Sequence, residues 1–471
     1  MVPGTQQQKG VKPASQTRTY KDVVSFLDSI KPIEYHKNSL QRMKLLDKLC
    51  GNPSQAMDIV LVAGSNGKSS TINFASKLLK EEGYTVGAAH ASHILNYNEQ
   101  IVVDLETIQN KNFTEVVSEV IDIAQANKIN ATAFEISTTA ALLFFKSQKV
   151  SIALLEVGIG GRNDATNIFN PKVVAITRIA QDQTEVLGDD LDVVTEHMLE
   201  VAKQGCWMIS AEQSKIRLQK MKTWAEKHDV SWAMPIRKLA ALPYMYEQLY
   251  GRTASLAERI AQLYVEHVCK KFSPFLRGNL LSTQRGQRGR PTLEAKRNAE
   301  LNPIKTLKKF WLEEFELLPG RFSLLDKEKP SILLDNGDNI DAFENVFLGI
   351  RLRHYQHPLK DFALIMGVST DTDILEAAKL VRYLLKKVGG QAFFVPISGK
   401  QSSHKQACHK PQDLANLAKE LGVKAQAYET FDRAFESAKQ LVDEREGLVA
   451  VTGSPQLVAQ YWHHRGIKKV G

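Results

Sequence analysis

The residues best suited to chemistry stand at 64–71, directly after a continuous apolar run. Two glycines, one lysine and four hydroxyl side chains fall within these eight positions. Glycines let backbone N–H groups close on phosphate oxygens, and a lysine at the start of a helix adds a positive charge. The pattern predicts a phosphate-binding loop that holds a nucleotide. The candidate nucleotide-binding residues of this loop are Gly64, Ser65, Asn66, Gly67, Lys68, Ser69, Ser70 and Thr71.

The loop departs from the usual eight-residue motif, because Val62 stands where that motif has glycine. What remains is the shorter form Gly-x-x-Gly-Lys-x-Ser, in which Ser70 is placed to hold Mg²⁺. The same residues also fit an ordinary strand-to-helix turn with a surface lysine. The loop by itself does not decide between these interpretations.

A carboxylate follows a later apolar run. The run at 151–156 closes on Glu156, and glycine-rich sequence comes next. A carboxylate at a strand end beside a phosphate loop suits a hard cation, which prefers oxygen ligands. Glu156 and Ser70 are therefore the candidate metal ligands. The alternative is that Glu156 caps a helix or pairs with Arg162.

Length and charge bound the kind of protein that carries these residues. The chain has 471 residues, more than a single core usually supports, so we expect two domains. The net charge of +9 is spread along the chain, which favours anionic small molecules over a nucleic-acid groove. The run 286–297 is a local basic exception. We expect the protein to be a monomer that binds neither nucleic acid nor membranes.

Cysteines and the N-terminal residues bear on location. The four cysteines are far apart and show no metal-binding spacing, so we expect reduced thiols. No apolar stretch approaches the length of a membrane span, and residues 1–19 lack the apolar core of a secretory signal. We expect this polar leader to be disordered and the protein to be cytoplasmic.

Alternating apolar runs and helical spacing predict a doubly wound, mostly parallel α/β sheet that contains the phosphate loop. Ligands of such a sheet lie at the carboxyl ends of its strands. The predicted elements of this part are helices within 20–50, a strand ending at 63, a helix over 71–82, a strand over 84–89, a helix over 113–127, an apolar segment at 131–134 with a helix through 145, strands over 150–157 and 173–177, and helices around 256–269 and 307–315.

A second alternating pattern begins at residue 331 and predicts a smaller Rossmann-like α/β domain. We therefore expect a nucleotide-binding domain over 20–322 and a second, smaller domain over 323–471, with 275–300 as a polar surface loop. The elements predicted for the second domain are strands over 331–335, 362–367, 391–395, 424–428 and 447–452, and helices over 340–352, 373–388, 411–421 and 430–443.

Several short sequence motifs follow one another in a fixed order along the chain. They are Cys50-Gly51-Asn52-Pro53, the phosphate loop, Ser92–Leu95 with Tyr97–Ile101, the segment 134–138, the segment 155–167, Leu318-Pro319-Gly320-Arg321-Phe322 and Gly453-Ser454. In this order and spacing the chain resembles the Mur ligase superfamily, and specifically the folylpolyglutamate synthase/dihydrofolate synthase family. In the phosphate loop, Ser65 and Ser69 replace the threonine and glycine of that family.

The resemblance implies an ATP-dependent ligase that joins L-glutamate to a folate, and also to dihydropteroate, through an acyl phosphate. ATP and Mg²⁺ would be the cofactors. Lys68, Ser70 and Glu156 would neutralise phosphate charge, with Mg²⁺ between Ser70 and the phosphates. Arg321 resembles the linker arginine that reaches the γ-phosphate, and Asp335 resembles the aspartate of the second domain that contacts ATP. Lys68, Glu156 and Arg321 are thus the candidate catalytic residues.

Four family positions are changed in this chain. Gln183 replaces a histidine that binds a second metal, and Met198 replaces a lysine that the family carbamylates to hold it. Asp338 replaces a histidine just after the first strand predicted for the second domain. Ala257 replaces an asparagine that lies near the nucleotide base in the family. The phosphate and first-metal residues survive, whereas the second-metal residues do not.

Three interpretations follow. The first is a ligase with a modified second-metal site, which uses His197, Gln183 or Glu200 instead. The second is a nucleotide-binding relative that has lost catalysis and acts as a scaffold. The third is a Mur-type ligase with a different acceptor.

Overall fold

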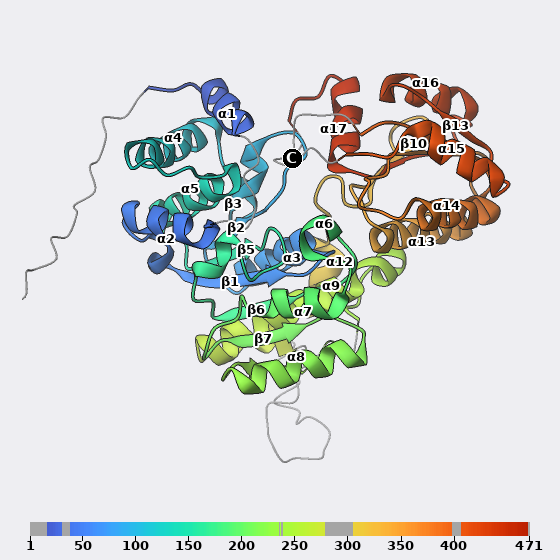
Figure 1. Ribbon diagram of the computed structural model, residues 1–471. Helices are drawn as coiled ribbons and strands as arrows, with labels where there is room; N and C mark the ends of the chain where they lie inside the picture. Colours follow the sequence, from blue (N-terminus) through green and yellow to red (C-terminus); the bar gives the residue numbers. More distant parts are fainter. Residues whose placement is uncertain are drawn as a thin grey trace, which may run out of the picture.

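Two sheets, each covered by helices on both faces, make up the computed structural model (Figure 1). It describes residues 17–30, 38–234, 236, 239–277, 305–397 and 407–469. Most of the leader, most of the predicted loop over 275–300 and the basic run 286–297 lie outside these residues. The start of that loop is not irregular as predicted, because Pro274–Arg277 form the short helix α10.

The first sheet has eight strands in the order β4-β3-β2-β5-β1-β6-β7-β8. β1 lies between β5 and β6 and is parallel to both, with Val62 opposite Glu156 on one side. The carboxyl ends of β5, β1 and β6 therefore meet at one edge of the sheet. The strands are β1 Asp58–Ala63, β2 Val86–Ala89, β3 Ile101–Val103, β4 Glu106–Thr107, β5 Ile152–Glu156, β6 Val173–Ile176, β7 Trp207–Ser210 and β8 Ser231–Trp232.

Successive residues of β1 point to opposite faces of this sheet, as the pleat of a strand requires. Ile59 and Leu61 pack against one layer of helices, and Val60 and Val62 pack against another. The first layer contains α1 Tyr20–Ser29, α2 Ser39–Leu49, α4 Asn110–Ala126, α5 Ala133–Ser147, α7 Leu191–Leu199 and α8 Lys215–Lys227. The second contains α3 Lys68–Glu81, α9 Tyr244–Gln262 and α12 Leu307–Glu314.

The second sheet has six strands in the order β13-β12-β11-β14-β10-β9. All are parallel except the edge strand β9, and helices cover both faces. The strands are β9 Ser323–Leu325, β10 Ser331–Leu334, β11 Phe362–Met366, β12 Gln391–Phe394, β13 Ala425–Ala427 and β14 Leu448–Thr452. The helices are α13 Ile340–Gln356, α14 Ile374–Val388, α15 Pro411–Glu420, α16 Phe431–Leu441 and α17 Pro455–His464.

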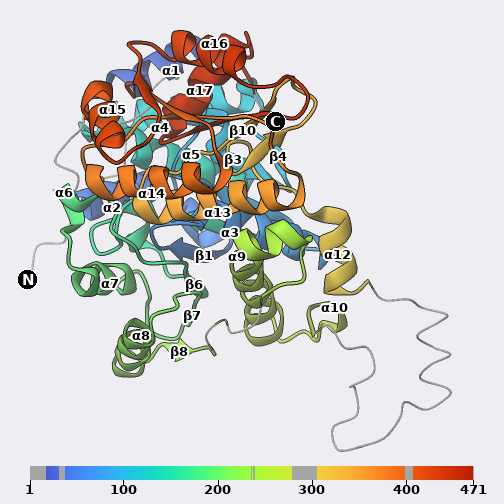
Figure 2. The same ribbon diagram turned by 90° about the vertical axis from the view of Figure 1, so that its right-hand side faces the viewer.

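The two sheets share one continuous apolar core through α9 and α13, which contact each other. Figure 2 shows α13 lying between the strands of the second sheet and α9. Residues 315–322, which we call the linker, run between α12 and β9. Phe322 at its end is buried, and its ring packs so closely on Gly349 of α13 that a side chain there would collide with it. The linker is thereby fixed against the second sheet.

The doubly wound, mostly parallel architecture predicted from the sequence is confirmed. Several boundaries were wrong. The helix after the phosphate loop begins at Lys68 and not at Thr71, and α5 takes in the second half of the segment 131–134. The helix expected around 256–269 begins at Tyr244. The division at 322/323 stays a prediction, although strands of the two sheets lie on either side of it.

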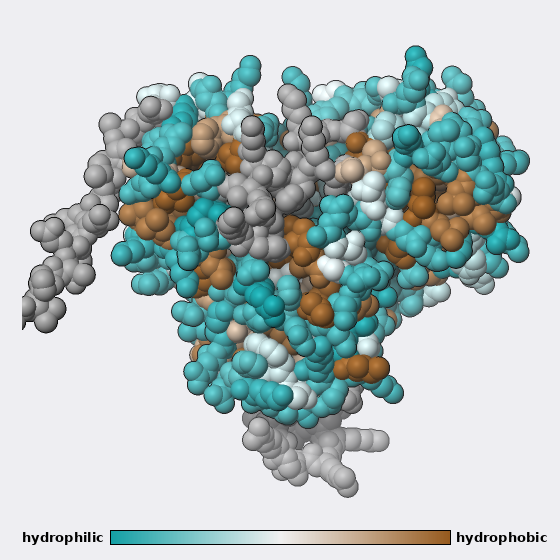
Figure 3. All heavy atoms as spheres, in the orientation of Figure 1, coloured by the Kyte–Doolittle hydropathy of each residue, from teal (hydrophilic) through white to brown (hydrophobic). Residues whose placement is uncertain are grey.

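The surface agrees with the composition. On the face in Figure 3, hydrophilic side chains cover most of the area and apolar side chains gather in small separate areas. Among the described residues, no helix is both long enough and apolar enough to cross a membrane.

Candidate active site

A cavity of about 870 Å³ lies where the carboxyl ends of the first sheet face the linker and the second sheet. It brings together nearly every residue that the sequence singled out. The predicted site residues that line it are Ser65, Asn66, Gly67, Lys68, Ser69, Ser70, Thr71, Glu156, Arg321 and Asp335. Gly64 does not line it. Its φ of +128° and the nearby Thr177 side chain leave no room for a Cβ, so Gly64 shapes the loop from behind.

The phosphate loop joins β1 to α3. The N-cap residue of α3 is Gly67, which has no side chain to make a capping bond. The N–H groups in the first turn of α3 therefore face the cavity uncapped. Lys68 Nζ donates to the carbonyls of Gly64 at 2.8 Å and Ser65 at 3.0 Å. The lysine therefore lies over its own loop, where its charge and the helix N-terminus act on the same point. This arrangement suits an anion such as phosphate.

Glu156 ends β5 and is buried, with 6% of its surface exposed. Its Oε2 accepts the Ser69 hydroxyl at 2.9 Å and the Ala91 N–H at 3.3 Å, and lies 3.4 Å from His90 Nδ1. Burial alone would raise the pKa of Glu156. The neighbouring His90 ring and the positive charges of Lys68 and Arg321 outweigh burial and hold that pKa at about 2. Glu156 is therefore ionised at neutral pH.

The alternative in which Glu156 pairs with Arg162 is wrong. Arg162 Nη2 lies 2.7 Å from Glu200 Oε1, in a different groove of the molecule. Glu156 instead faces the phosphate loop.

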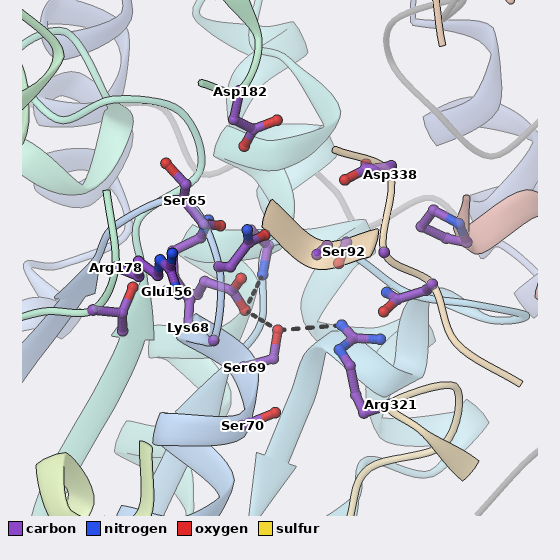
Figure 4. A pocket seen from close by; sticks show the side chains of 18 of the residues that line it. Ser65, Lys68, Ser69, Ser70, Ser92, Glu156, Arg178, Asp182, Arg321 and Asp338 are labelled. Atoms are coloured by element: carbon purple, nitrogen blue, oxygen red, sulfur yellow. Dashed lines mark hydrogen bonds between the residues drawn. The ribbon is translucent and has the colours of Figure 1, made fainter. Parts of the chain in front are cut away.

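Arg321 reaches the same place from the linker. Its Nη2 donates to Ser69 Oγ at 3.3 Å, so that Ser69 stands between the arginine and Glu156 (Figure 4). Asp335 follows β10 and its two oxygens accept the N–H groups of Phe322 and Gly337, both at 2.8 Å. Burial nevertheless raises the pKa of Asp335 to about 6. The predicted ATP contact of Asp335 stays a prediction, and its observed bonds hold the end of the linker beside Arg321.

The residues present fit a divalent cation at the predicted first position. Ser70 and Glu156 offer oxygen donors at the edge of the loop, and these are what Mg²⁺ prefers. Glu156 Oε1 accepts no hydrogen bond from the described residues, whereas Oε2 has three polar neighbours. One carboxylate oxygen is thus available.

A second metal site finds less support. In the described residues no three His, Cys, Asp or Glu side chains gather in a way that could hold a metal ion. Gln183 lines the cavity, but Glu200 pairs with Arg162, and His197 is not among the lining residues. Met198 is buried in the core beneath the sheet. The proposed substitutes His197 and Glu200 therefore do not reach this site.

Two carboxylates that the sequence analysis did not place in the site also line the cavity. Asp182 follows β6 and Asp338 follows β10, so they approach from the two sheets (Figure 4). Burial and the charge of Asp182 raise the pKa of Asp338 to about 7, and burial raises that of Asp182. Asp338 had been noticed only as a departure from a family pattern. His90, which lies against Glu156, had no signal in the sequence.

The two halves of the cavity are joined by polar contacts at the first turn of α13. Asn66 and Asn339 exchange amide hydrogen bonds of 2.9 and 3.0 Å, and Asn66 Nδ2 also donates to Asp341 Oδ2 at 2.8 Å. Asn339 is at the same time the N-cap of α13, accepting from the Ala342 N–H at 3.0 Å. The phosphate loop is thus bound directly to the second sheet's first helix.

Part of the chain matches a known family model. Residues 62–230, which include the phosphate loop and Glu156, match the family model of the Mur ligase middle domain. The chain is 34% identical over 197 residues to the dihydrofolate synthase/folylpolyglutamate synthase of Bacillus subtilis. That stretch is 41% of this chain and 46% of the relative. The chain spans about half the length of the curated relatives that it matches first.

Solved structures share the whole fold. The Mycobacterium tuberculosis folylpolyglutamate synthase complexed with ADP superposes with a TM-score of 0.73 and 18% identity, covering 95% of this chain and 98% of that one. A bifunctional folylpolyglutamate synthase/dihydrofolate synthase with Mn, AMPPNP and L-glutamate bound superposes with a TM-score of 0.70 and 22% identity. The match covers 97% of this chain and 100% of that one. Together these matches confirm the resemblance to this Mur ligase family that the motifs indicated.

Proposed function

We propose that the chain is an ATP-dependent amide ligase that adds L-glutamate to the carboxylate of a folate, with dihydropteroate as a second acceptor. The observation that carries this proposal is the meeting of Lys68, Ser70, Glu156 and Arg321 in one cavity, from three separate parts of the chain. The name of the Bacillus subtilis relative and the ligands of the two solved structures support the choice of substrates.

The reaction has two steps. An oxygen of the acceptor carboxylate attacks the γ-phosphorus of ATP, the bond to the bridging oxygen breaks, and ADP leaves. The amine of glutamate then attacks the acyl carbon of the acyl phosphate. The carbon–oxygen bond breaks, inorganic phosphate leaves with that oxygen, and the nitrogen loses a proton to solvent.

The residues of this chain have distinct roles in the proposal. Lys68 and the N–H groups at the start of α3 bind the phosphates, and Arg321 adds positive charge from the linker. Glu156 and Ser70 would hold Mg²⁺, which neutralises phosphate charge when it is bound. The second sheet closes the cavity from the other side, which limits water that would hydrolyse an acyl phosphate.

A second candidate is a nucleotide-binding protein without ligase activity. The observation that favours it is the loss of the second-metal residues, with Gln183 in the cavity and Met198 in the core.

A third candidate is a Mur-type ligase with another acceptor. A cytoplasmic location and a monomeric state belong to the main proposal, and the four free cysteines are consistent with a reducing compartment.

One assay separates these candidates. ADP release and incorporation of labelled L-glutamate are measured together with a panel of folates and dihydropteroate. The proposal predicts one ADP per glutamate incorporated with at least one of these acceptors. Tight ATP binding without turnover on any acceptor supports the non-catalytic candidate. ADP release that depends on an unrelated acceptor supports the third.

A further inference from the structure

Ser69 occupies a position that the pattern Gly-x-x-Gly-Lys-x-Ser leaves unspecified, yet its hydroxyl makes two contacts at the centre of the site. It is buried, with 7% of its surface exposed. Its Oγ donates to Glu156 Oε2 at 2.9 Å and accepts from Arg321 Nη2 at 3.3 Å. One hydroxyl thereby connects the first turn of α3, the end of β5 and the linker (Figure 4).

The Ser69 hydroxyl is the polar group nearest to Glu156 Oε2, at 2.9 Å. The Ala91 N–H and His90 Nδ1 lie farther away, at 3.3 and 3.4 Å. A hydrogen bond to an ionised carboxylate is stronger than one between neutral groups, and it weakens with distance. Ser69 therefore makes the closest of the three contacts that set which way the Glu156 carboxylate turns, and Oε1 takes part in none of them.

The same hydroxyl also fixes Arg321. In the described part of the chain, Ser69 Oγ is the hydrogen-bond acceptor recorded for the Arg321 guanidinium. The backbone around Arg321 is held separately, because its N–H donates to the Leu318 carbonyl and the next N–H donates to Asp335. Without the hydroxyl, the linker would keep these two backbone bonds but lose its side-chain contact with the phosphate loop, so its amides should open more readily.

We propose that Ser69 is a positioning residue that sets the orientation of Glu156 and docks the linker arginine Arg321 on the phosphate loop. The proposal builds on the ligase function for its kinetic consequence, but the coupling of the two side chains is a property of the protein alone. Ser69 does not react. It places one negative and one positive group so that both act on the phosphates bound by the loop.

Three variants test the proposal. Ser69→Ala removes the hydroxyl and both contacts, and Ser69→Thr retains a hydroxyl at the same place. Ser76→Ala is the matched control, because Ser76 lies on the same helix and is buried, and its hydroxyl has no hydrogen-bond partner in the described structure. A general effect of removing a buried hydroxyl from α3 would appear in both alanine variants.

The first measurement needs no activity. Hydrogen exchange of the backbone amides in residues 318–325 is followed in the full-length protein without nucleotide or metal. We expect several-fold faster exchange in Ser69→Ala, and wild-type exchange in Ser69→Thr and Ser76→Ala. Unchanged exchange in Ser69→Ala would overturn the docking of the linker. The result stands even if the wild type ligates no folate, so a failure of the proposed function is recognised separately.

The second measurement is kinetic and includes the double variant Ser69→Ala/Arg321→Ala. We expect Ser69→Ala to lower kcat on the order of 10-fold while the KM for ATP changes little, and Ser69→Thr to restore most of the rate. Because part of the effect of Ser69→Ala acts through Arg321, the double variant should lose less than the product of the two single losses. Losses that multiply in the double variant would contradict the coupling.

Discussion

Arg178 Nε lies 2.6 Å from Asp341 Oδ1, which joins the segment after β6 to the first turn of α13. The same carboxylate accepts from Asn66 through its other oxygen. Asp341 therefore contacts both the phosphate loop and the strand end beside it. Because the Arg178 side chain is half exposed while Asp341 is largely buried, we expect the pair to be more than a solvated surface contact.

We predict that Arg178→Gln and Asp341→Asn each destabilise the protein, and that their effects are not additive. The interaction energy from a double-mutant cycle of urea unfolding should be roughly 0.5–1 kcal/mol. An Arg178→Asp/Asp341→Arg exchange should recover part of the loss, because the opposite charges still face each other. Additive single effects would show that the two side chains do not interact in solution.

Lys68→Ala should abolish ATP turnover and leave the fold intact. Among the described residues, Lys68 bonds only to carbonyls of its own loop, and it supplies charge to phosphate, not core packing. Loss of such a contact typically costs on the order of 10²–10³ in rate. Turnover is compared with that of Lys80→Ala, a lysine on the same helix whose amine bonds to the Asp104 carbonyl away from the cavity. Equal turnover in the two variants would remove the loop from the mechanism.

Glu156 should make stability depend on pH in acid. Its pKa of about 2 in the folded protein lies below the unfolded value of 4.5. A lowered pKa stabilises the folded state above pH 4.5, and this stabilisation disappears as pH falls toward 2. At neutral pH it amounts to roughly 3 kcal/mol. The unfolding free energy of wild type minus that of Glu156→Gln should therefore shrink between pH 5 and pH 2; a constant difference would contradict the ionised state.

The metal content should differ from that of a two-metal ligase. Met198 is buried and cannot be carbamylated, and no three His, Cys, Asp or Glu side chains of the described residues gather in a way that could hold a metal ion. We expect one Mn²⁺ per chain in titrations with a non-hydrolysable ATP analogue, a large loss of this binding in Glu156→Gln, and no response of activity to bicarbonate. Two equally tight Mn²⁺ ions, or stimulation by bicarbonate, would show that the substitutions have been misinterpreted.

The sequence predicted what depends on local pattern. Apolar runs followed by polar residues located β1 and β5, and the spacing of glycine, lysine and serine located the phosphate loop. The strands β3, β4 and β9 were missed because two or three residues are too short to show a period. β3 and β4, at one end of the first sheet, and β9, at the edge of the second, pair antiparallel with their neighbours, which the alternation of strands and helices does not predict.

Contacts between distant residues could not be predicted in this way. Asn66 and Asn339 are 273 positions apart, and nothing local to either residue indicates that their amides meet. His90 likewise follows a short strand, and its place beside Glu156 depends on how β2 and β5 pair. The backbone N–H groups of Phe322 and Gly337 that Asp335 accepts were not predicted either, and its contact with ATP stays a prediction.

The central claim is that the linker arginine serves catalysis and not merely binding, and one variant tests it directly. ATP affinity and kcat are measured on Arg321→Ala and on the wild type with the same folate acceptor. We predict that kcat falls far more than ATP affinity, because Arg321 acts on charge that develops as the γ-phosphoryl group is transferred. Equal losses in affinity and rate would reduce Arg321 to an ATP anchor, and a wild type that binds ATP without turning over any acceptor would contradict the ligase itself.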